Sequence, residues 1–154
     1  MEYLIGEYEA KLDTKGRMVL PAGLKRQLPE AEREGFIVNR GIGKFLVLNT
    51  RKSWDKTMQK MAKLSEYNRK HDEFMRRFMR GSTELFLDGA NRLLLPKGLM
   101  DYAAIKTDIV ISCRINKIEI WAKEAYEALW ENEEDDLAQL AEEVMGSLKD
   151  VDDE

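Results

Sequence analysis

Hydrophobic and polar positions near the start of the chain indicate two strands joined by a tight turn. Residues 6–12 alternate partly apolar with charged side chains, and residues 18–20 form a short apolar run. Between them, Asp-Thr-Lys-Gly carries turn chemistry, because Gly16 accepts a positive φ without a Cβ penalty. The pattern predicts a β-hairpin. A short helix over residues 22–28 should follow, with Pro21 where it begins.

The same order of positions returns later in the chain. The segment LDTKGRMVLPAGL at residues 12–24 matches LDGANRLLLPKGL at residues 87–99, 75 positions further on. The second copy also predicts a proline-led helix, at residues 97–103. Each copy then continues into another predicted hairpin, over residues 36–48 and residues 109–121. Two copies are too few for a solenoid, so the repeat indicates two half-domains related by pseudo-symmetry.

Two apolar stripes between the copies predict two amphipathic helices. The first stripe places large apolar residues three or four positions apart, at Trp54, Met58, Met61, Leu64 and Tyr67. The second stripe consists of Phe74, Met75, Phe78 and Met79. Such stripes are typical of core or helix-pairing surfaces. We therefore expect these helices to join the copies and to supply subunit contacts, and we expect Asn49 or Thr50 to cap the first one.

These elements divide the chain into four parts. A last helix is predicted from Ala122 to Leu148, with a frayed end at residues 150–154. The expected boundaries are a first repeat at 3–55, a connecting helical segment at 56–82, a second repeat at 83–130, and an acidic C-terminal helix and tail at 131–154.

Charge is segregated along the chain, which the net value of −4 conceals. Residues 131–154 hold eleven acids and only Lys149, whereas the remaining residues hold 24 bases and 18 acids. Residues 51–82 hold ten bases against four acids and account for the whole basic excess. Two interpretations fit this distribution. One is a solvated helix face with a solubilising tail, and the other is a role with a polyanion.

Several function classes find little support in the residues. One cysteine, Cys113, excludes an intrachain disulfide and any multi-cysteine metal site, and His71 is the only histidine. The carboxylates Asp13 and Asp88 have no nucleophile motif or phosphate-binding glycine run beside them. We therefore predict no enzyme activity, metal or cofactor. Without a membrane-span candidate or a signal peptide's basic start, a cytoplasmic protein with no membrane partner is expected.

The doubled Leu-Asp-x-x-x-Arg signature, at Asp13/Arg17 and Asp88/Arg92, resembles the MraZ family, whose members look like tandem relatives of the AbrB and SpoVT DNA-binding module. The similarity runs from about Tyr3 to Trp130. It implies an α+β fold with two swapped-hairpin, double-split β-barrel repeats as a pseudo-dimer, connecting amphipathic helices and a C-terminal helix. It also implies a nucleoid-associated bacterial transcriptional regulator. Such a protein would bind repeated DNA elements upstream of the cell-division and wall-synthesis gene cluster, as a ring-like homo-oligomer.

The signature residues have properties that suit double-stranded DNA. A guanidinium such as that of Arg17 matches the O6 and N7 acceptors of guanine, so we assign Arg17 to base readout. Lys15, at the turn tip, is assigned a supporting contact to a phosphate or a guanine edge. The candidate DNA-binding residues are thus Lys15, Arg17 and Arg92, and the turns are supported by Asp13, Gly16 and Asp88.

Other interpretations of the same turns stay open. The Asp and Arg residues could pair with each other, or across the pseudo-twofold axis, and only hold the hairpins together. The second copy has Ala90 and Asn91 where the first has Lys15 and Gly16, so the first turn should dominate DNA contact and a base-reading role for Arg92 is weaker. Alternative functions are a protein-binding assembly module and an antitoxin-like member of the same superfamily.

Oligomerisation belongs to the predicted mechanism, because one turn tip offers few contacts and linking many tips raises avidity. The methionine and phenylalanine stripes of residues 54–79 are the candidate subunit contacts, with Phe78 as the position to test. The acidic tail should lie on the side away from DNA, since its charge repels phosphates. The alternative is that it competes with DNA for the basic face.

Overall fold

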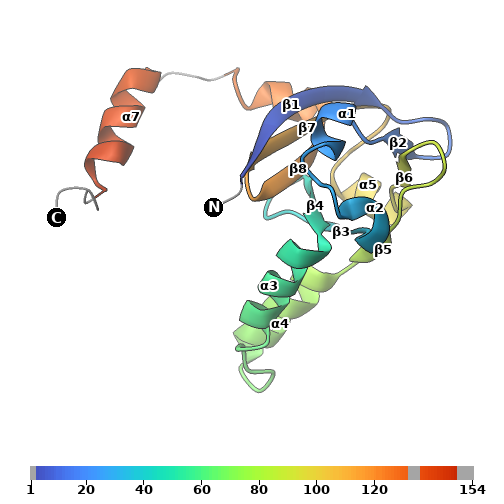
Figure 1. Ribbon diagram of the computed structural model, residues 1–154. Coiled ribbons are helices and arrows are strands. Elements are labelled where there is room, and N and C mark those ends of the chain that lie inside the picture. The colour runs from blue at the N-terminus through green and yellow to red at the C-terminus, as the bar shows by residue number, and fades with distance from the viewer. Residues whose placement is uncertain (1–2, 132–135, 149–154) are drawn as a thin grey trace.

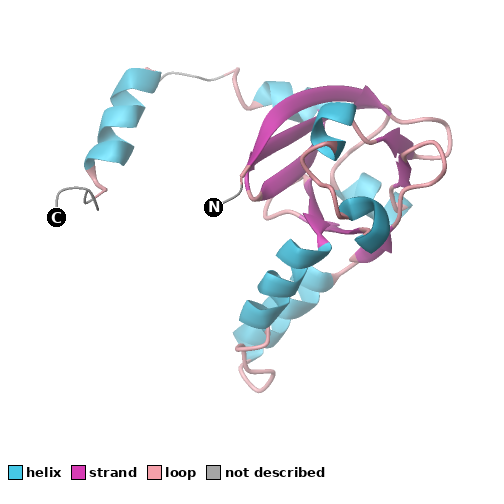
Figure 2. Ribbon diagram, viewed as in Figure 1, coloured by secondary structure: helices cyan, strands magenta, loops and turns pink. Residues whose placement is uncertain are grey.

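The computed structural model describes residues 3–131 and 136–148. It contains a six-stranded antiparallel sheet in the order β1-β7-β8-β4-β3-β5 and a separate two-stranded ribbon, β2-β6 (Figures 1 and 2). The strands are β1 (Leu4–Lys11), β2 (Arg17–Val19), β3 (Phe36–Arg40), β4 (Leu46–Thr50), β5 (Thr83–Leu85), β6 (Arg92–Leu94), β7 (Asp108–Ile115) and β8 (Lys117–Ala122). The helices are α1 (Ala22–Lys25), α2 (Ala31–Glu34), α3 (Arg51–Met61), α4 (Arg69–Met79), α5 (Lys97–Tyr102), α6 (Lys123–Ala128) and α7 (Leu137–Gly146).

The two copies exchange strands. β1 pairs along its length with β7 of the second copy, and β5 of the second copy pairs with β3 of the first. β2 likewise pairs with β6. The predicted strand, turn and strand at residues 6–20 are present, but the predicted local hairpin is wrong. The strands diverge beyond the turn because β1 pairs with β7 and β2 pairs with β6, both of the other copy.

The second hairpin of each copy forms as predicted. β3 pairs with β4, and β7 pairs with β8. The two hairpins join through β4 and β8, where Leu46 lies opposite Ile120. The large sheet is therefore built from strands of both copies.

A single hydrophobic core fills the space between the sheet, the ribbon and the short helices. Its fully buried members come from both copies, including Met18 and Leu93 under the ribbon and Leu24 and Leu99 in the matching proline-led helices. Burial of one such side chain contributes roughly 1.5–3 kcal/mol relative to its exposed state. The repeats therefore stabilise each other.

The helices α3 and α4 form a hairpin that projects from the sheet (Figure 1). Thr50 caps α3 by accepting from the backbone N–H of Ser53 (3.2 Å), as one of the two predicted caps. Phe78 of α4 stacks on the buried Trp54 of α3, with ring centroids 6.1 Å apart. Phe78 therefore packs within the hairpin, Phe74 beside it is more exposed, and a subunit contact through this stripe stays a prediction.

The end of the chain differs from the prediction of one helix over Ala122–Leu148. α6 ends at Ala128 and α7 begins at Leu137, after a cap in which Asp136 accepts from the N–H of Ala138 (3.2 Å). Residues 132–135 and the predicted frayed end at 150–154 lie outside the described residues. Among the helices that the structure describes, none combines the length and the apolar character needed to cross a membrane.

Candidate nucleic-acid interface

The β2-β6 ribbon has one face toward the core and one toward solvent. Its register pairs Arg17 with Leu94, Met18 with Leu93 and Val19 with Arg92. Met18 and Leu93 are fully buried, whereas Val19 and Leu94 are each about half exposed. Alternate residues of a strand point to opposite faces. The outer face of this ribbon therefore carries one arginine from each copy.

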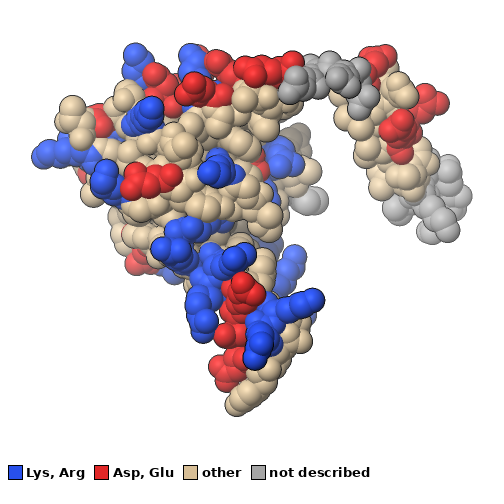
Figure 3. Space-filling model, turned by 180° about the vertical axis from the view of Figure 1, so that it is seen from behind, with Lys and Arg blue, Asp and Glu red and all other residues tan. Residues whose placement is uncertain are grey.

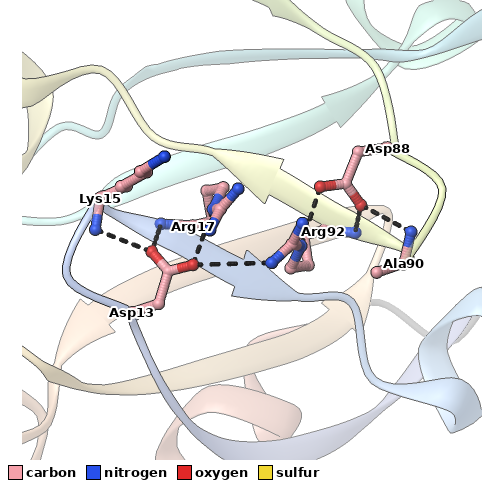
Figure 4. A network of polar contacts seen from close by, with 6 residues as sticks. All are labelled: Asp13, Lys15, Arg17, Asp88, Ala90 and Arg92. Carbon is pink, nitrogen blue, oxygen red and sulfur yellow. Dashed lines mark hydrogen bonds and ion pairs between the residues drawn. The ribbon is translucent and has the colours of Figure 1, made fainter.

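The first turn holds Arg17 through the Asp13 carboxylate (Figure 4). Oδ1 of Asp13 accepts from the backbone N–H groups of Lys15 and Arg17, both at 2.9 Å. Oδ2 accepts from Nε of Arg17 at 2.7 Å. Gly16 has a φ of 84°, in the left-handed region that favours glycine. This geometry fixes the shape of the turn, and a supporting role of Asp13 and Gly16 in DNA binding stays a prediction.

The second turn repeats the arrangement with different residues. Asp88 accepts from the backbone N–H groups of Ala90 and Arg92, both at 2.9 Å, and from Nε of Arg92 at 2.8 Å. Asn91 takes the place of Gly16 with a φ of 60°, which asparagine tolerates better than most residues. Its side-chain oxygen accepts from Nζ of Lys25 at 2.8 Å.

Both carboxylates are charged at neutral pH. The backbone N–H of Arg17, followed by its side chain and the N–H of Lys15, lowers the pKa of Asp13 from 3.8 to about 2, although burial opposes this shift. The equivalent donors, with the N–H of Arg92 foremost, lower the pKa of Asp88. Hydrogen bonds to the ionised form account for the direction in both turns. Each aspartate is thus a fixed anion that orients its arginine.

Pairing between aspartate and arginine is present, and it leaves part of each guanidinium available. Arg17 is bonded to Asp13 through Nε, and Arg92 also approaches Oδ2 of Asp13 across the ribbon, with Nη1 at 3.9 Å. In residues 3–131 and 136–148, no partner accepts a hydrogen bond from the terminal nitrogens of Arg17. The Arg17 side chain is 29% exposed and that of Arg92 is 32% exposed. The pair therefore fixes the stem while the outer fork can reach a ligand.

Lys15 and Ala90 make the two turns unequal. Lys15 is exposed at the tip of the first turn, and its side chain extends away from the Asp13 carboxylate (Figure 4). Ala90 holds the matching position in the second turn and brings no charge. The first copy consequently contributes Lys15 and Arg17 at its turn, whereas the second copy contributes Arg92.

The contact between Lys25 and Asn91 was missed by the sequence analysis. In the repeat alignment Lys25 matches Met100, and Met100 in turn lies beside Gly16, where a Cβ would be 3.2 Å from its sulfur. The alignment contained this signal, because positions 25 and 100 are equivalent. Without the strand exchange, nothing indicated that each would contact the turn of the other copy.

Comparison with known proteins establishes the family. A model described as "MraZ protein, putative antitoxin-like" matches residues 3–77 and again residues 78–147. The chain belongs to the MraZ family. The family predicted from the doubled signature is therefore confirmed, and so is the repeat, because the MraZ model matches twice.

Curated MraZ relatives match nearly the whole chain. A protein of Flavobacterium psychrophilum named "Transcriptional regulator MraZ" is 42% identical over 97% of this chain and 96% of its own length. Its namesake in Christiangramia forsetii is 42% identical over 94% of both chains. That of Cytophaga hutchinsonii is 36% identical over 97% of this chain and 99% of its own.

Proposed function

We propose that this chain is a transcriptional regulator that binds double-stranded DNA sequence-specifically through the outer face of the β2-β6 ribbon. The observation that carries the proposal is the pair of aspartate-anchored arginines, one from each copy, on that face. The major groove admits a two-stranded β-ribbon, and the free fork of Arg17 can bond both acceptors of a guanine. The names of the relatives, which are transcriptional regulators at 36–42% identity, support this role.

The roles of the individual residues follow from the two turns. Arg17 reads a base, Lys15 adds a contact to a phosphate or a second base edge, and Arg92 makes a weaker contact because its turn lacks the lysine. Asp13 and Asp88 orient the arginines through the hydrogen bonds that their carboxylates accept. The proposal includes no cofactor and no enzymatic step.

Further parts of the proposal concern the assembly and the setting. The reciprocal strand exchange supports a swapped-hairpin, double-split β-barrel in which the two copies act as a pseudo-dimer. The cations of one ribbon give few contacts, so a ring-like homo-oligomer is needed for avidity on repeated elements. Those elements lie upstream of the cell-division and wall-synthesis gene cluster, and the protein acts in the cytoplasm on the nucleoid.

The proposal is tested by the electrophoretic shift of a duplex that carries the repeated elements, compared with a scrambled duplex. Loss of one bidentate arginine contact, about 1–3 kcal/mol, should weaken specific binding by Arg17→Ala about 5- to 150-fold. Arg33→Ala removes the same charge from the exposed surface of α2 and is the matched control. Equal affinity and equal salt dependence of wild type and Arg17→Ala would contradict the assignment of Arg17 to base readout.

A further inference from the structure

A groove lies beside the α3-α4 hairpin. It borders the end of β3, which is four strands away from β1 in the sheet order. It has a volume of about 400 Å³ and is lined by the loop at residues 41–43, by α4 and by Tyr102. Phe74, 43% exposed, contributes an aromatic wall and stacks on Phe78 with centroids 5.6 Å apart. Ile42 is 78% exposed on the same loop. The groove therefore offers apolar surface to a ligand.

The loop that borders the groove is held in place by Tyr102. Its hydroxyl group lies within hydrogen-bond distance of the carbonyl oxygens of Gly41 (2.9 Å) and Gly43 (2.8 Å). The Arg40 guanidinium lies over the Tyr102 ring, 4.4 Å from its centroid, and Nε of Arg40 donates to the carbonyl of Arg80 at 3.0 Å. A fixed loop loses little entropy when a ligand binds.

The rim of the groove is positively charged. Arg40, Arg77 and Arg80 line it, and none of the described residues that line it is acidic. Arg77 has an exposed partner, Glu73, at 3.6 Å, and an exposed pair of this kind contributes little. Figure 3 shows Lys and Arg side chains gathered over the hairpin and its junction with the sheet. The groove thus fits an apolar ligand with acidic flanks.

Helix α7 combines exposed apolar side chains with acidic ones. Its large apolar side chains recur at helical spacing and are 45–77% exposed, namely Leu137, Leu140, Val144, Met145 and the adjoining Leu148. The described residues 136–148 contain three acids, Asp136, Glu142 and Glu143, and no base. An isolated helix of ten residues is marginal in water, so α7 needs a surface to cover its apolar face.

We propose that the groove of one copy binds α7 of a second copy. α6, which precedes α7, is tied to β1 by Lys123 and Glu9 (3.3 Å), whereas the groove begins at Arg40 of β3, four strands away in the sheet order. A neighbouring copy can present its α7 without crossing the sheet. Each chain carries both halves of this contact, so it is head-to-tail, and head-to-tail contacts close into rings or extend into filaments.

This contact is the subunit interface of the proposed ring, and in that respect it rests on the proposed function. It is independent of base readout by Arg17, which belongs to a different surface. Ion pairs between the arginine rim and the acids of α7 should make the assembly weaker at high salt.

The test is complementation between two defective variants, with mass measured by light scattering after size exclusion. Leu140→Asp/Val144→Asp disables the helix, and Arg77→Glu/Arg80→Glu disables the groove, all at exposed positions. Each variant alone should have a lower mass than wild type, and an equimolar mixture should give a defined dimer through the one intact helix and groove. Glu32→Arg, on exposed α2, is the control and should keep the wild-type mass.

Unchanged mass for both variants, or no dimer in the mixture, would overturn the proposal. A second measurement uses Ile42→Cys/Leu140→Cys under oxidation. A ladder of covalent oligomers supports exchange between copies, whereas a monomer with an internal disulfide shows that α7 binds its own chain and refutes the second-copy contact. Arg17→Ala should retain the wild-type mass. DNA binding to a single element should be lost in Arg17→Ala but kept by the monomeric helix variants. The two measurements therefore test the proposed function and the subunit contact separately.

Discussion

Replacement of Leu93 by alanine tests the strand exchange through stability. Leu93 is fully buried beneath the ribbon, directly opposite the fully buried Met18 of the other copy. A buried Leu→Ala change costs about 2–5 kcal/mol, because transfer energy is lost and a cavity remains. For a chain of 154 residues this corresponds to a fall in melting temperature of roughly 2–4 °C per kcal/mol, or about 10 °C in total.

The assay is urea and thermal unfolding followed by far-UV circular dichroism. Because the core is shared, Leu93→Ala should lower the midpoint of one cooperative transition and leave its slope unchanged. The control is Leu94→Ala in the same strand, where the side chain is about half exposed and the expected change is within about 0.5 kcal/mol. Two separate transitions, with only one displaced by the substitution, would refute strand exchange and indicate repeats that fold independently.

Two further predictions concern the first turn. Lys15→Ala should reduce the slope of log affinity against log salt by about one, with little change in sequence preference, as measured by fluorescence anisotropy on matched and scrambled duplexes. A reduced preference with an unchanged slope would instead make Lys15 a base reader. Because the folded pKa of Asp13 is about 2, below its ordinary 3.8, its stabilising contribution is complete above pH 3.8 and declines as pH falls toward 2. Urea midpoints between pH 5 and pH 2 should therefore fall more steeply for wild type than for Asp13→Asn, and parallel curves would contradict the assigned cause.

Local patterns predicted the elements that local chemistry determines. The Asp13 turn needs only a carboxylate, nearby amides and a residue that accepts positive φ, and all of these lie within five positions. The cap at Thr50 and the proline-led helices are equally local. Asn91, which matches Gly16 in the repeat, likewise has a positive φ.

Pairing between distant strands could not be predicted in the same way. Alternation over residues 6–12 shows that a strand has two different faces, but it does not select the partner. The entropic cost of a longer loop grows slowly with its length, so a partner about 100 residues away competes well with a local one. β1 therefore pairs with β7, where it gains eight register partners, rather than with the three-residue β2.

The end of α6 also depends on effects that apolar spacing does not show. The sequence from Glu131 to Asp136 contains five acids, and like charges at helical spacing destabilise a helix. The predicted helix over Ala122–Leu148 is therefore divided into α6, which ends at Ala128, and α7, which begins at Leu137. The stacking of Phe78 on Trp54 likewise depends on how the hairpin closes, and local spacing does not show it.

The inequality of the two turns gives the chain a direction. A homodimer of identical modules has a true twofold axis, and such symmetry matches palindromic DNA. Here one covalent unit has Lys15 and Gly16 at one end of the ribbon and Ala90 and Asn91 at the other. On the proposed mode of DNA binding, the first turn would be the stronger end of the ribbon and the second turn the weaker end. Copies arranged head-to-tail would all point the same way, so the arrangement favours elements that repeat in one orientation over elements that are inverted.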